Sequence, residues 1–258
     1  MTRPLSPDLA SLEEYPGAKG GAGVFQTIIN QIPPHDLWIE AFAGSAIITR
    51  RKRPARASVV IDSDAAVCAA LSSRVAKNGD TAGVTVVQAD AVVWLTKKWG
   101  TLNARTVVYC DPPYLSTTLR QVGRQYYAES FNTETLHRGL ISILHALSRH
   151  GVKCLISGYQ SQLYQRAFPD WRRVEYRTRT HGGTVTESLW CNFPEPTELH
   201  DYRFLGHNRR ERERIKRKLA RWKARLEKMP LLERRLIAAA VAENGGAYRD
   251  ATNGDSGH

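Results

Sequence analysis

Thr-Val-Val-Tyr-Cys-Asp-Pro-Pro-Tyr, residues 106–114, joins a short apolar run to a carboxylate, two prolines and an aromatic ring. The apolar part is rich in β-formers and is bounded by breakers, which is typical of a buried strand in a parallel sheet. Pro112 and Pro113 end the strand because proline has a fixed φ and no amide hydrogen. The residue before a proline favours an extended backbone. We therefore expect Asp111 to project from the carboxyl end of the strand, where open α/β sheets bind their ligands.

The polar groups of this turn suit a planar amine. Asp111 offers a carboxylate, Pro112 a carbonyl oxygen and Tyr114 a flat ring for stacking. An exocyclic amine such as the 6-amino group of adenine can donate to both oxygens while its ring system stacks. The structural alternative is a strand followed by an ordinary polyproline turn. The Asp and the Tyr on either side of the two prolines favour a functional site.

Composition predicts a folded protein with a basic C-terminal part. The 258 residues are 42% hydrophobic, enough for the core of one large domain or of one domain with an appendage. The formal net charge is +12, and residues 209–235 contribute 13 Lys or Arg against 4 Asp or Glu, a net of +9. A basic excess of this kind suggests a polyanionic partner.

The cysteines and the apolar segments bear on the compartment. The four cysteines are scattered without paired spacing, which favours neither zinc nor disulfides. No apolar segment reaches about 18 residues, and the N-terminus lacks the features of a signal peptide. We therefore expect a cytoplasmic protein without a membrane anchor or a metal ion.

A glycine-rich loop precedes the first expected helix. Residues 1–14 are expected to be a flexible lead, and the loop Tyr15-Pro-Gly-Ala-Lys19 continues through glycines to residue 23. Apolar residues at helical spacing follow up to Pro33. Free amides at the start of a helix can receive a negative group, and Lys19 adds a positive charge there. A plain flexible entry turn is an equally good interpretation.

The next strand is expected at residues 37–42 and runs into Ala43-Gly44-Ser45-Ala46. Small residues at a strand-to-helix turn allow a ligand to approach the backbone closely. The pattern is not G-x-G-x-x-G, so a dinucleotide is not indicated. Glu40, just before the turn, is a candidate partner for an amino group.

Acidic residues follow the second and third expected strands. The strand at residues 58–61 ends at Asp62-Ser-Asp64, a spacing at which a carboxylate commonly binds ribose hydroxyls. We assign Asp62 to the ribose and Asp64 to the cap of the following helix. After a third strand at residues 84–87, Asp90 either caps a helix or reaches an adenine amine.

The segment after Tyr114 interleaves basic and aromatic residues. They suit phosphate contacts and base stacking, with an ordinary surface loop as the alternative; they are Arg120, Arg124, Tyr126, Tyr127 and Phe131. A helix at residues 133–149, a strand at 153–157 and a helix at 160–168 are expected next. A β-hairpin formed by residues 172–178 and 184–193 should carry Arg177, Arg179 and His181 near its tip.

The C-terminal part differs in composition from the rest of the chain. Residues 209–228 predict a basic helix with an apolar stripe of Ile215, Leu219, Trp222, Leu226 and Met229. Pro230 should break it, and a second helix should stop at Gly245-Gly246, with a disordered tail at 247–258. The charged face is either solvated on a docked helix or binds DNA or RNA phosphates through residues such as Lys216 and Lys223. A coiled-coil dimerisation element is a third interpretation.

Taken in order, these motifs resemble the Dam-type family of DNA adenine-N6 methyltransferases over residues 15–193. The motifs that carry the resemblance are Tyr15-Pro-Gly-Ala-Lys19, Glu40-Ala-Phe-Ala-Gly-Ser45, Asp62-Ser-Asp64, Asp111-Pro-Pro-Tyr114, Ser157-Gly-Tyr159 and Thr186-Glu-Ser-Leu-Trp-Cys-Asn-Phe193. The resemblance implies an α/β, Rossmann-like S-adenosylmethionine-dependent methyltransferase fold, with a mostly parallel sheet and a C-terminal β-hairpin. The change in composition after Pro194-Glu-Pro196 sets the expected end of the catalytic domain, which spans residues 15–196 and is followed by a basic helical extension at 197–246.

The resemblance also implies site residues. Asp111, Pro112 and Tyr114 would act on the target adenine. The S-adenosylmethionine site would comprise Tyr15, Lys19, Glu40, Phe42, Gly44, Ser45, Asp62, Asp90 and Asp111. From the basic and aromatic residues themselves, and not from the resemblance, we expect DNA contacts at Arg120, Arg124, Tyr126, Arg177, Arg179, Lys216 and Lys223.

The sequence departs from the family pattern at two places. Ala41 stands where a proline is usual. Only about 20 residues separate Asp90 from Asp111, whereas family members that read a defined site carry a recognition domain there. Specificity is therefore expected to be loose or to come from other segments. Methylation of RNA or of another planar amine, and nucleic-acid binding without catalysis, are the competing functions.

Overall fold

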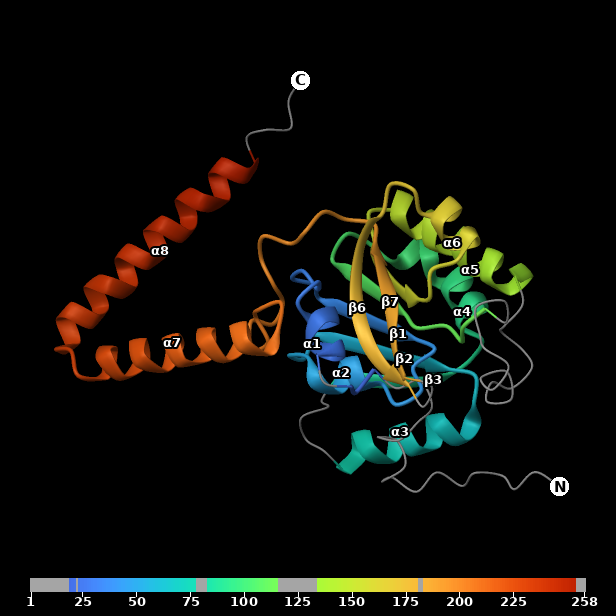
Figure 1. Ribbon diagram of the computed structural model, residues 1–258, viewed down its shortest axis with the longest axis horizontal. Helices are drawn as coiled ribbons and strands as arrows, with labels where there is room; N and C mark the ends of the chain where they lie inside the picture. The colour runs from blue at the N-terminus through green and yellow to red at the C-terminus, as the bar shows by residue number, and fades with distance from the viewer. Residues whose placement is uncertain (1–18, 22, 78–82, 116–133, 181–182, 254–258) are drawn as a thin grey trace. The chain divides into compact units, whose positions relative to one another are not determined.

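The computed structural model describes residues 19–21, 23–77, 83–115, 134–180 and 183–253 (Figure 1). Within these ranges the chain divides into two compact units, Met1–Leu205 and Gly206–His258. The strands of the first unit are β1 (Leu37–Ala41), β2 (Ala57–Asp62), β3 (Val84–Gln88), β4 (Thr106–Cys110), β5 (Lys153–Gly158), β6 (Arg172–Thr180) and β7 (Gly183–Cys191). Its helices are α1 (Val24–Ile29), α2 (Ile47–Arg51), α3 (Ala65–Lys77), α4 (Ala91–Lys98), the short 3-10 helix η3 (Trp99–Thr101), α5 (Glu134–Arg149) and α6 (Gln162–Ala167).

All seven strands form one sheet in the order β3-β2-β1-β4-β5-β7-β6. The first five are parallel, and β7 runs antiparallel to both β5 and β6. The expected positions of the five parallel strands and of the hairpin are confirmed to within about two residues. This order, with an antiparallel β7 inserted before β6, is that of the S-adenosylmethionine-dependent methyltransferase fold, so the predicted fold class is confirmed.

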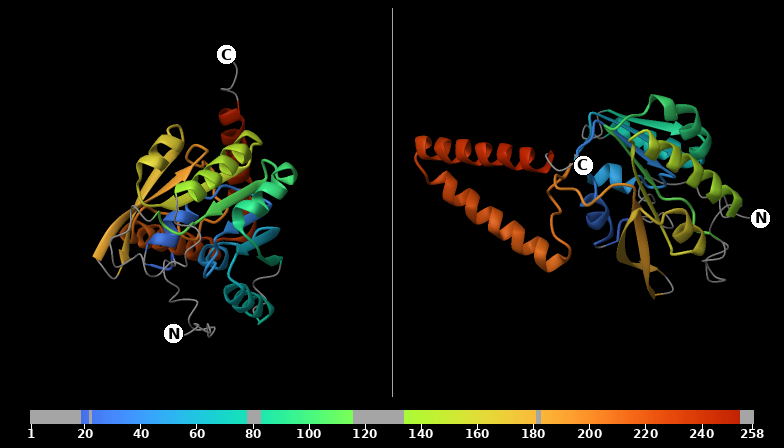
Figure 2. Two further views of the ribbon diagram at one scale, coloured as in Figure 1. Left: turned by 90° about the vertical axis from the view of Figure 1, so that its right-hand side faces the viewer. Right: turned by 90° about the horizontal axis from the view of Figure 1, so that it is seen from above.

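The sheet is covered by helices on both faces (Figures 1 and 2). Alternate residues of a strand point to opposite faces, so neighbours along β4 enter different cores. Val107 and Tyr109 pack with Trp38 and the apolar residues of α1 and α2. Val108 and Cys110 pack with those of α4, α5 and α6. The central strand is therefore buried on both sides, as its continuous apolar run predicts.

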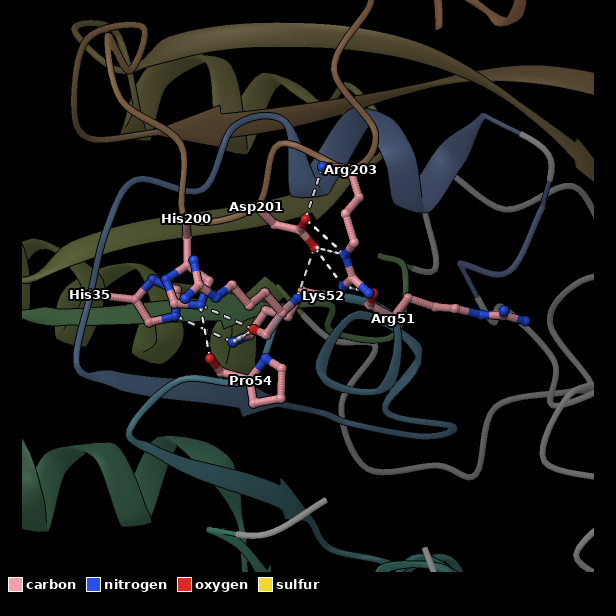
Figure 3. A network of polar contacts seen from close by, with 8 residues as sticks. His35, Arg51, Lys52, Pro54, His200, Asp201 and Arg203 are labelled. Carbon is pink, nitrogen blue, oxygen red and sulfur yellow. Dashed lines mark hydrogen bonds and ion pairs between the residues drawn. The ribbon is translucent and has the colours of Figure 1, made fainter. Parts of the chain in front are cut away.

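A strap formed by residues 199–205 follows the sheet and packs back onto the first unit (Figure 3). Its Asp201 carboxylate accepts from the Arg53 amide at 2.8 Å, and Arg203 pairs with Asp201 at 2.7 Å. The His200 ring stacks on His35 with centroids 3.9 Å apart, above the buried Lys52 ammonium, which lies 3.3 Å from His35 Nε2. These contacts assign the strap to the first unit. The compact unit therefore ends after Leu205, beyond the boundary expected at residue 196.

The second unit consists of two helices, α7 (Arg209–Glu227) and α8 (Leu231–Asn253). The helices lie on either side of Pro230, where a break was expected. α8 runs through Gly245-Gly246, where a stop was expected, and continues to Asn253. Two glycines cost a helix only about 1 kcal/mol each relative to alanine, which the rest of a long helix can tolerate.

Among the described residues, no helix is long and apolar enough to cross a membrane. The same residues contain no group of three His, Cys, Asp or Glu side chains arranged to hold a metal ion. The four cysteines are free and buried.

Candidate active site

The carboxyl ends of β1, β4 and β5 meet at one edge of the sheet. Ala41 is paired with Cys110, and Cys110 with Ile156, so the residues that follow these strands lie side by side. The Asp111 amide donates to the Ala41 carbonyl at 3.3 Å, which keeps Asp111 in line with the strand after the ladder ends. Asp111 is thus held at the edge where the two prolines were expected to place it.

The Asp111 carboxylate is fixed through one of its two oxygens. Oδ1 accepts from Ser157 Oγ at 2.7 Å and from the Lys19 ammonium at 2.8 Å. Ser157 is itself bonded to the Tyr109 hydroxyl at 3.0 Å. Among the described residues, none donates to Oδ2, and the side chain is 19% exposed. The second oxygen is therefore the one available to a ligand.

Lys19 joins Asp111 to a second carboxylate. Its side chain is only 3% exposed, and Nζ lies 3.2 Å from Glu187 Oε2 and 3.1 Å from the Tyr114 hydroxyl. Burial opposes charging, but the carboxylates of Asp111 and Glu187 outweigh it and raise the pKa of Lys19 well above its usual value. Burial raises the pKa of Asp111, and the Lys19 charge counteracts that effect. The ammonium stays charged and favours the ionised form of Asp111.

Tyr114 is held by both its hydroxyl and its ring. The hydroxyl donates to Glu187 Oε1 at 2.8 Å, and Tyr176 donates to the other oxygen of Glu187 at 3.0 Å. The ring stacks on Tyr159 with centroids 4.2 Å apart. A small cleft beside the turn is lined by Pro112, Pro113, Tyr114, Leu115, His137, Ser157, Gly158, Tyr159 and Tyr164.

The turn after β1 forms the neighbouring part of the site. Three of its residues have a positive φ: Phe42 (58°), Gly44 (47°) and Ala46 (49°). Such a backbone costs energy for non-glycine residues and is concentrated at binding sites. The Gly44 amide donates to Asp62 Oδ2 at 2.8 Å, so the carboxylate after β2 is tied to this turn. Burial raises the pKa of Asp62.

Glu40 supports the same turn from inside the protein. It is 3% exposed, and its Oε2 accepts from the Thr49 amide at 2.7 Å and from the Thr49 hydroxyl. Burial raises its pKa to about 6. The contacts tie β1 to α2 across the turn, and the expected role as partner of an amino group stays a prediction.

The remaining expected residues fall into three groups. Asp90 Oδ1 accepts from the Val93 amide at 2.8 Å and caps α4, which is one of its two expected roles; the cofactor contact stays a prediction. Ser45 is buried in the turn after β1. Arg177 is exposed on β6, where Arg179 also lies, and Lys216 and Lys223 are exposed on α7. Tyr15, Arg120, Arg124, Tyr126, Tyr127, Phe131 and His181 lie outside the described residues.

Glu187 is a site residue that was not expected from the sequence. It shares a strand face with Leu189 and Cys191, both buried, so its carboxylate points into an apolar core face. An acidic residue in the inward register of a strand is a detectable signal, because buried charges require a partner. Ser157 and Tyr159 belong to a motif quoted from the sequence, but their contacts with Asp111 and Tyr114 come only from the folded arrangement, as does the contact of Tyr176 with Glu187.

Comparisons with known proteins agree with this geometry. A family model described as "D12 class N6 adenine-specific DNA methyltransferase" matches residues 96–181, and one described as "Conserved hypothetical protein 95" matches residues 21–136. No curated protein matched the chain.

Several solved structures are similar to part of the chain. A conserved hypothetical protein from Streptococcus pyogenes is 14% identical with a TM-score of 0.44, covering 69% of this chain and 99% of its own. SMU.1697c from Streptococcus mutans, in complex with SAH, is 8% identical with a TM-score of 0.44, covering 64% and 93%. A SAM-dependent methyltransferase from Agrobacterium tumefaciens is 11% identical with a TM-score of 0.42, covering 65% and 58%.

The strand order and the D12 match agree on the same chemistry. S-adenosylmethionine is the cofactor both of this fold class and of the family whose model matches residues 96–181, in agreement with the expected cofactor. The chain therefore has the fold of the S-adenosylmethionine-dependent methyltransferases and contains a segment, including the Asp111-Pro-Pro-Tyr114 turn, that is similar to the D12 class of adenine-specific enzymes.

Proposed function

We propose that this protein methylates the 6-amino group of adenine in DNA, with loose or undefined sequence specificity. The observation that carries the proposal is the Asp111 carboxylate, held through Oδ1 at the carboxyl end of β4 and followed by two prolines and a fixed tyrosine ring. The match of residues 96–181 to the D12 class includes this turn.

The described residues fit S-adenosylmethionine at the turn after β1. Positive φ values at Phe42, Gly44 and Ala46 leave a tight turn of small residues, and Asp62 borders it with a partly exposed carboxylate. Asp62 would bind the ribose hydroxyls, while the turn backbone accommodates the rest of the molecule. When bound, the cofactor supplies a methyl group on a positively charged sulfur.

Asp111, Pro112 and Tyr114 would act on the target base. A base within a duplex is unreachable, so it must be flipped out at a cost of a few kcal/mol. Tyr114 would stack on the base, while Asp111 Oδ2 and the Pro112 carbonyl accept hydrogen bonds from its amine. These bonds orient the nitrogen lone pair and increase its electron density. Catalysis would then depend on positioning and electrostatics, without a covalent bond to the protein.

Loose specificity is supported by the connection between β3 and β4. This connection is completely described, and it contains only α4 and η3. A recognition domain has no room there. Contacts to DNA would instead come from Arg177 and Arg179 on β6, from Lys216 and Lys223 on α7, and from the segment with Arg120, Arg124 and Tyr126.

The test is nucleoside analysis of DNA and RNA after incubation with the full chain and S-adenosylmethionine. N6-methyladenine in DNA is the expected product. Its appearance only in RNA, or methylation of cytosine, would replace the proposed substrate.

Asp111→Ala should abolish transfer, because the amine loses its acceptor, while S-adenosylmethionine binding by calorimetry largely survives. Asp64→Ala is the matched control, since Asp64 caps α3, and it should retain transfer. Retained methylation in Asp111→Ala would remove Asp111 from the mechanism.

A further inference from the structure

The two functional side chains of the Asp-Pro-Pro-Tyr turn are joined by a buried ion pair. Lys19 Nζ lies 2.8 Å from Asp111 Oδ1 and 3.1 Å from the Tyr114 hydroxyl, and that hydroxyl donates to Glu187 at 2.8 Å. We propose that Lys19 and Glu187 are positioning residues that fix the spacing of Asp111 and Tyr114 and set the charge around Asp111. This inference rests on the proposed methyl transfer.

Burying the charges of Lys19 and Glu187 costs desolvation free energy. Lys19 is 3% exposed and Glu187 is 2% exposed, so both charges have lost most of their hydration. A buried pair of this kind can often be replaced by apolar residues without loss of stability, so stability alone does not account for it. Glu187 accepts from Tyr114 of the turn on one oxygen and from the buried Tyr176 of β6 on the other, so it links the turn to the core. The pair therefore connects both functional side chains of the turn to the buried end of β7.

The charges around Asp111 come from every element packed against it. Lys19 lies before α1. The other titratable groups that interact with Asp111 are Glu40 on β1, Tyr109 and Cys110 on β4, Tyr114 in the turn, Tyr164 on α6, Tyr176 on β6 and Glu187 on β7. Lys19 lowers the pKa of Asp111, whereas Glu187 raises it. An ionised Asp111 would accept the hydrogen bond and stabilise the positive charge that develops on the amine nitrogen as the nitrogen–methyl bond forms and the sulfur–methyl bond breaks; that charge is lost when the amine releases a proton. Lys19 and Glu187 should thus affect the reaction in opposite ways.

Three variants of the full chain test this: Lys19→Met, Glu187→Gln and the double variant. Lys19→Met should lower kcat at neutral pH, on the order of 100-fold, and move the acidic limb of the kcat profile to higher pH. Glu187→Gln keeps an acceptor for Tyr114 and should move the acidic limb to lower pH, with a smaller loss of kcat. The double variant should return the limb towards its wild-type position. If the acidic limb of the kcat profile lies at the same pH in wild type and in all three variants, the proposal is overturned, since a packing role changes kcat without moving that limb.

A second measurement, on the cofactor-free protein, does not depend on activity. In Lys19→Met the folded-state pKa of Asp111 rises further above its unfolded value. The unfolding free energy relative to wild type should therefore be highest at low pH and fall as pH rises through that pKa. Adding Glu187→Gln should weaken the fall. A difference from wild type that is independent of pH between about 4 and 8 would contradict the inference. A wild-type chain that methylates no nucleic acid would contradict the proposed function instead.

Discussion

Two aspartates only two residues apart have separate tasks after β2. Asp64 Oδ1 accepts from the Ala66 amide at 2.7 Å at the start of α3, which is the expected cap. Asp62 accepts instead from the Gly44 amide and faces the turn after β1. The role of Asp64 as a helix cap is confirmed. The ribose contact of Asp62 stays a prediction, which can be tested by comparing substitutions of the two aspartates.

Asp62→Ala should weaken S-adenosylmethionine binding roughly 10- to 100-fold, because a hydrogen bond to a charged group contributes about 1.5–3 kcal/mol. Calorimetry measures this directly. Asp64→Ala is the matched control. It should bind the cofactor normally while losing about 1 kcal/mol of unfolding free energy with its helix cap. Equal affinity in both variants would exclude the ribose role.

The strap shows how an element without regular structure completes the first unit. The His200 amide donates to the Ile32 carbonyl at 2.9 Å, and Asn30 donates to the Phe204 carbonyl at 2.7 Å, so the strap fastens the end of α1. Lys52, which is 3% exposed, lies beside the strap (Figure 3). Its ammonium is 4.9 Å from the centroid of the Trp38 ring. Burial lowers the pKa of Lys52 to about 7 and that of His35 to about 3.

Lys52 should make stability depend on pH. Its folded-state pKa lies below the unfolded value of about 10.4, so the unfolded chain binds more protons between pH 7 and 10. As pH rises from 7 to 9, the unfolding free energy of the wild type should therefore increase relative to that of Lys52→Met. Urea denaturation measures both values. Lys97→Met, at an exposed site on α4, is the control and should show no such trend. A constant difference between wild type and Lys52→Met would contradict the lowered pKa.

The two units differ in what holds their helices in place. The helices of the first unit bury apolar faces against the sheet, whereas α7 has no buried residue and α7 and α8 leave Leu219, Trp222, Leu232 and Leu236 exposed. On α7, exposed arginines recur every three or four residues along one face, forming a row of Arg210, Arg214, Arg217, Arg221 and Arg225. Such a row matches a phosphate backbone better than a second copy of an equally basic helix.

Replacing these five arginines by glutamine should weaken DNA binding by a similar factor for all sequences. It should also reduce the dependence of affinity on salt, because each lost phosphate contact lowers the log–log slope by about 0.9. Fluorescence anisotropy at several salt concentrations measures both effects. Lys97→Gln with Lys98→Gln on α4 is the control and should change the slope less. If the slope of log affinity against log salt concentration is unchanged in the five-residue variant, the arginine row is a solvated surface that does not contact DNA phosphates.

The sequence determined the parallel strands, the order of the motifs and the position of Asp111. Hydrophobic runs, prolines and helix caps act over a few residues, so local patterns are sufficient to predict them. Tertiary structure alone decided which charges meet. Lys19 and Glu187 are separated by 168 residues along the chain. The strand order β4-β5-β7 brings Glu187 near Asp111, and Lys19, which precedes α1, packs between the two carboxylates. Burial then changes the chemistry of the assembled groups, because a carboxylate without water depends on whichever cation the fold places beside it.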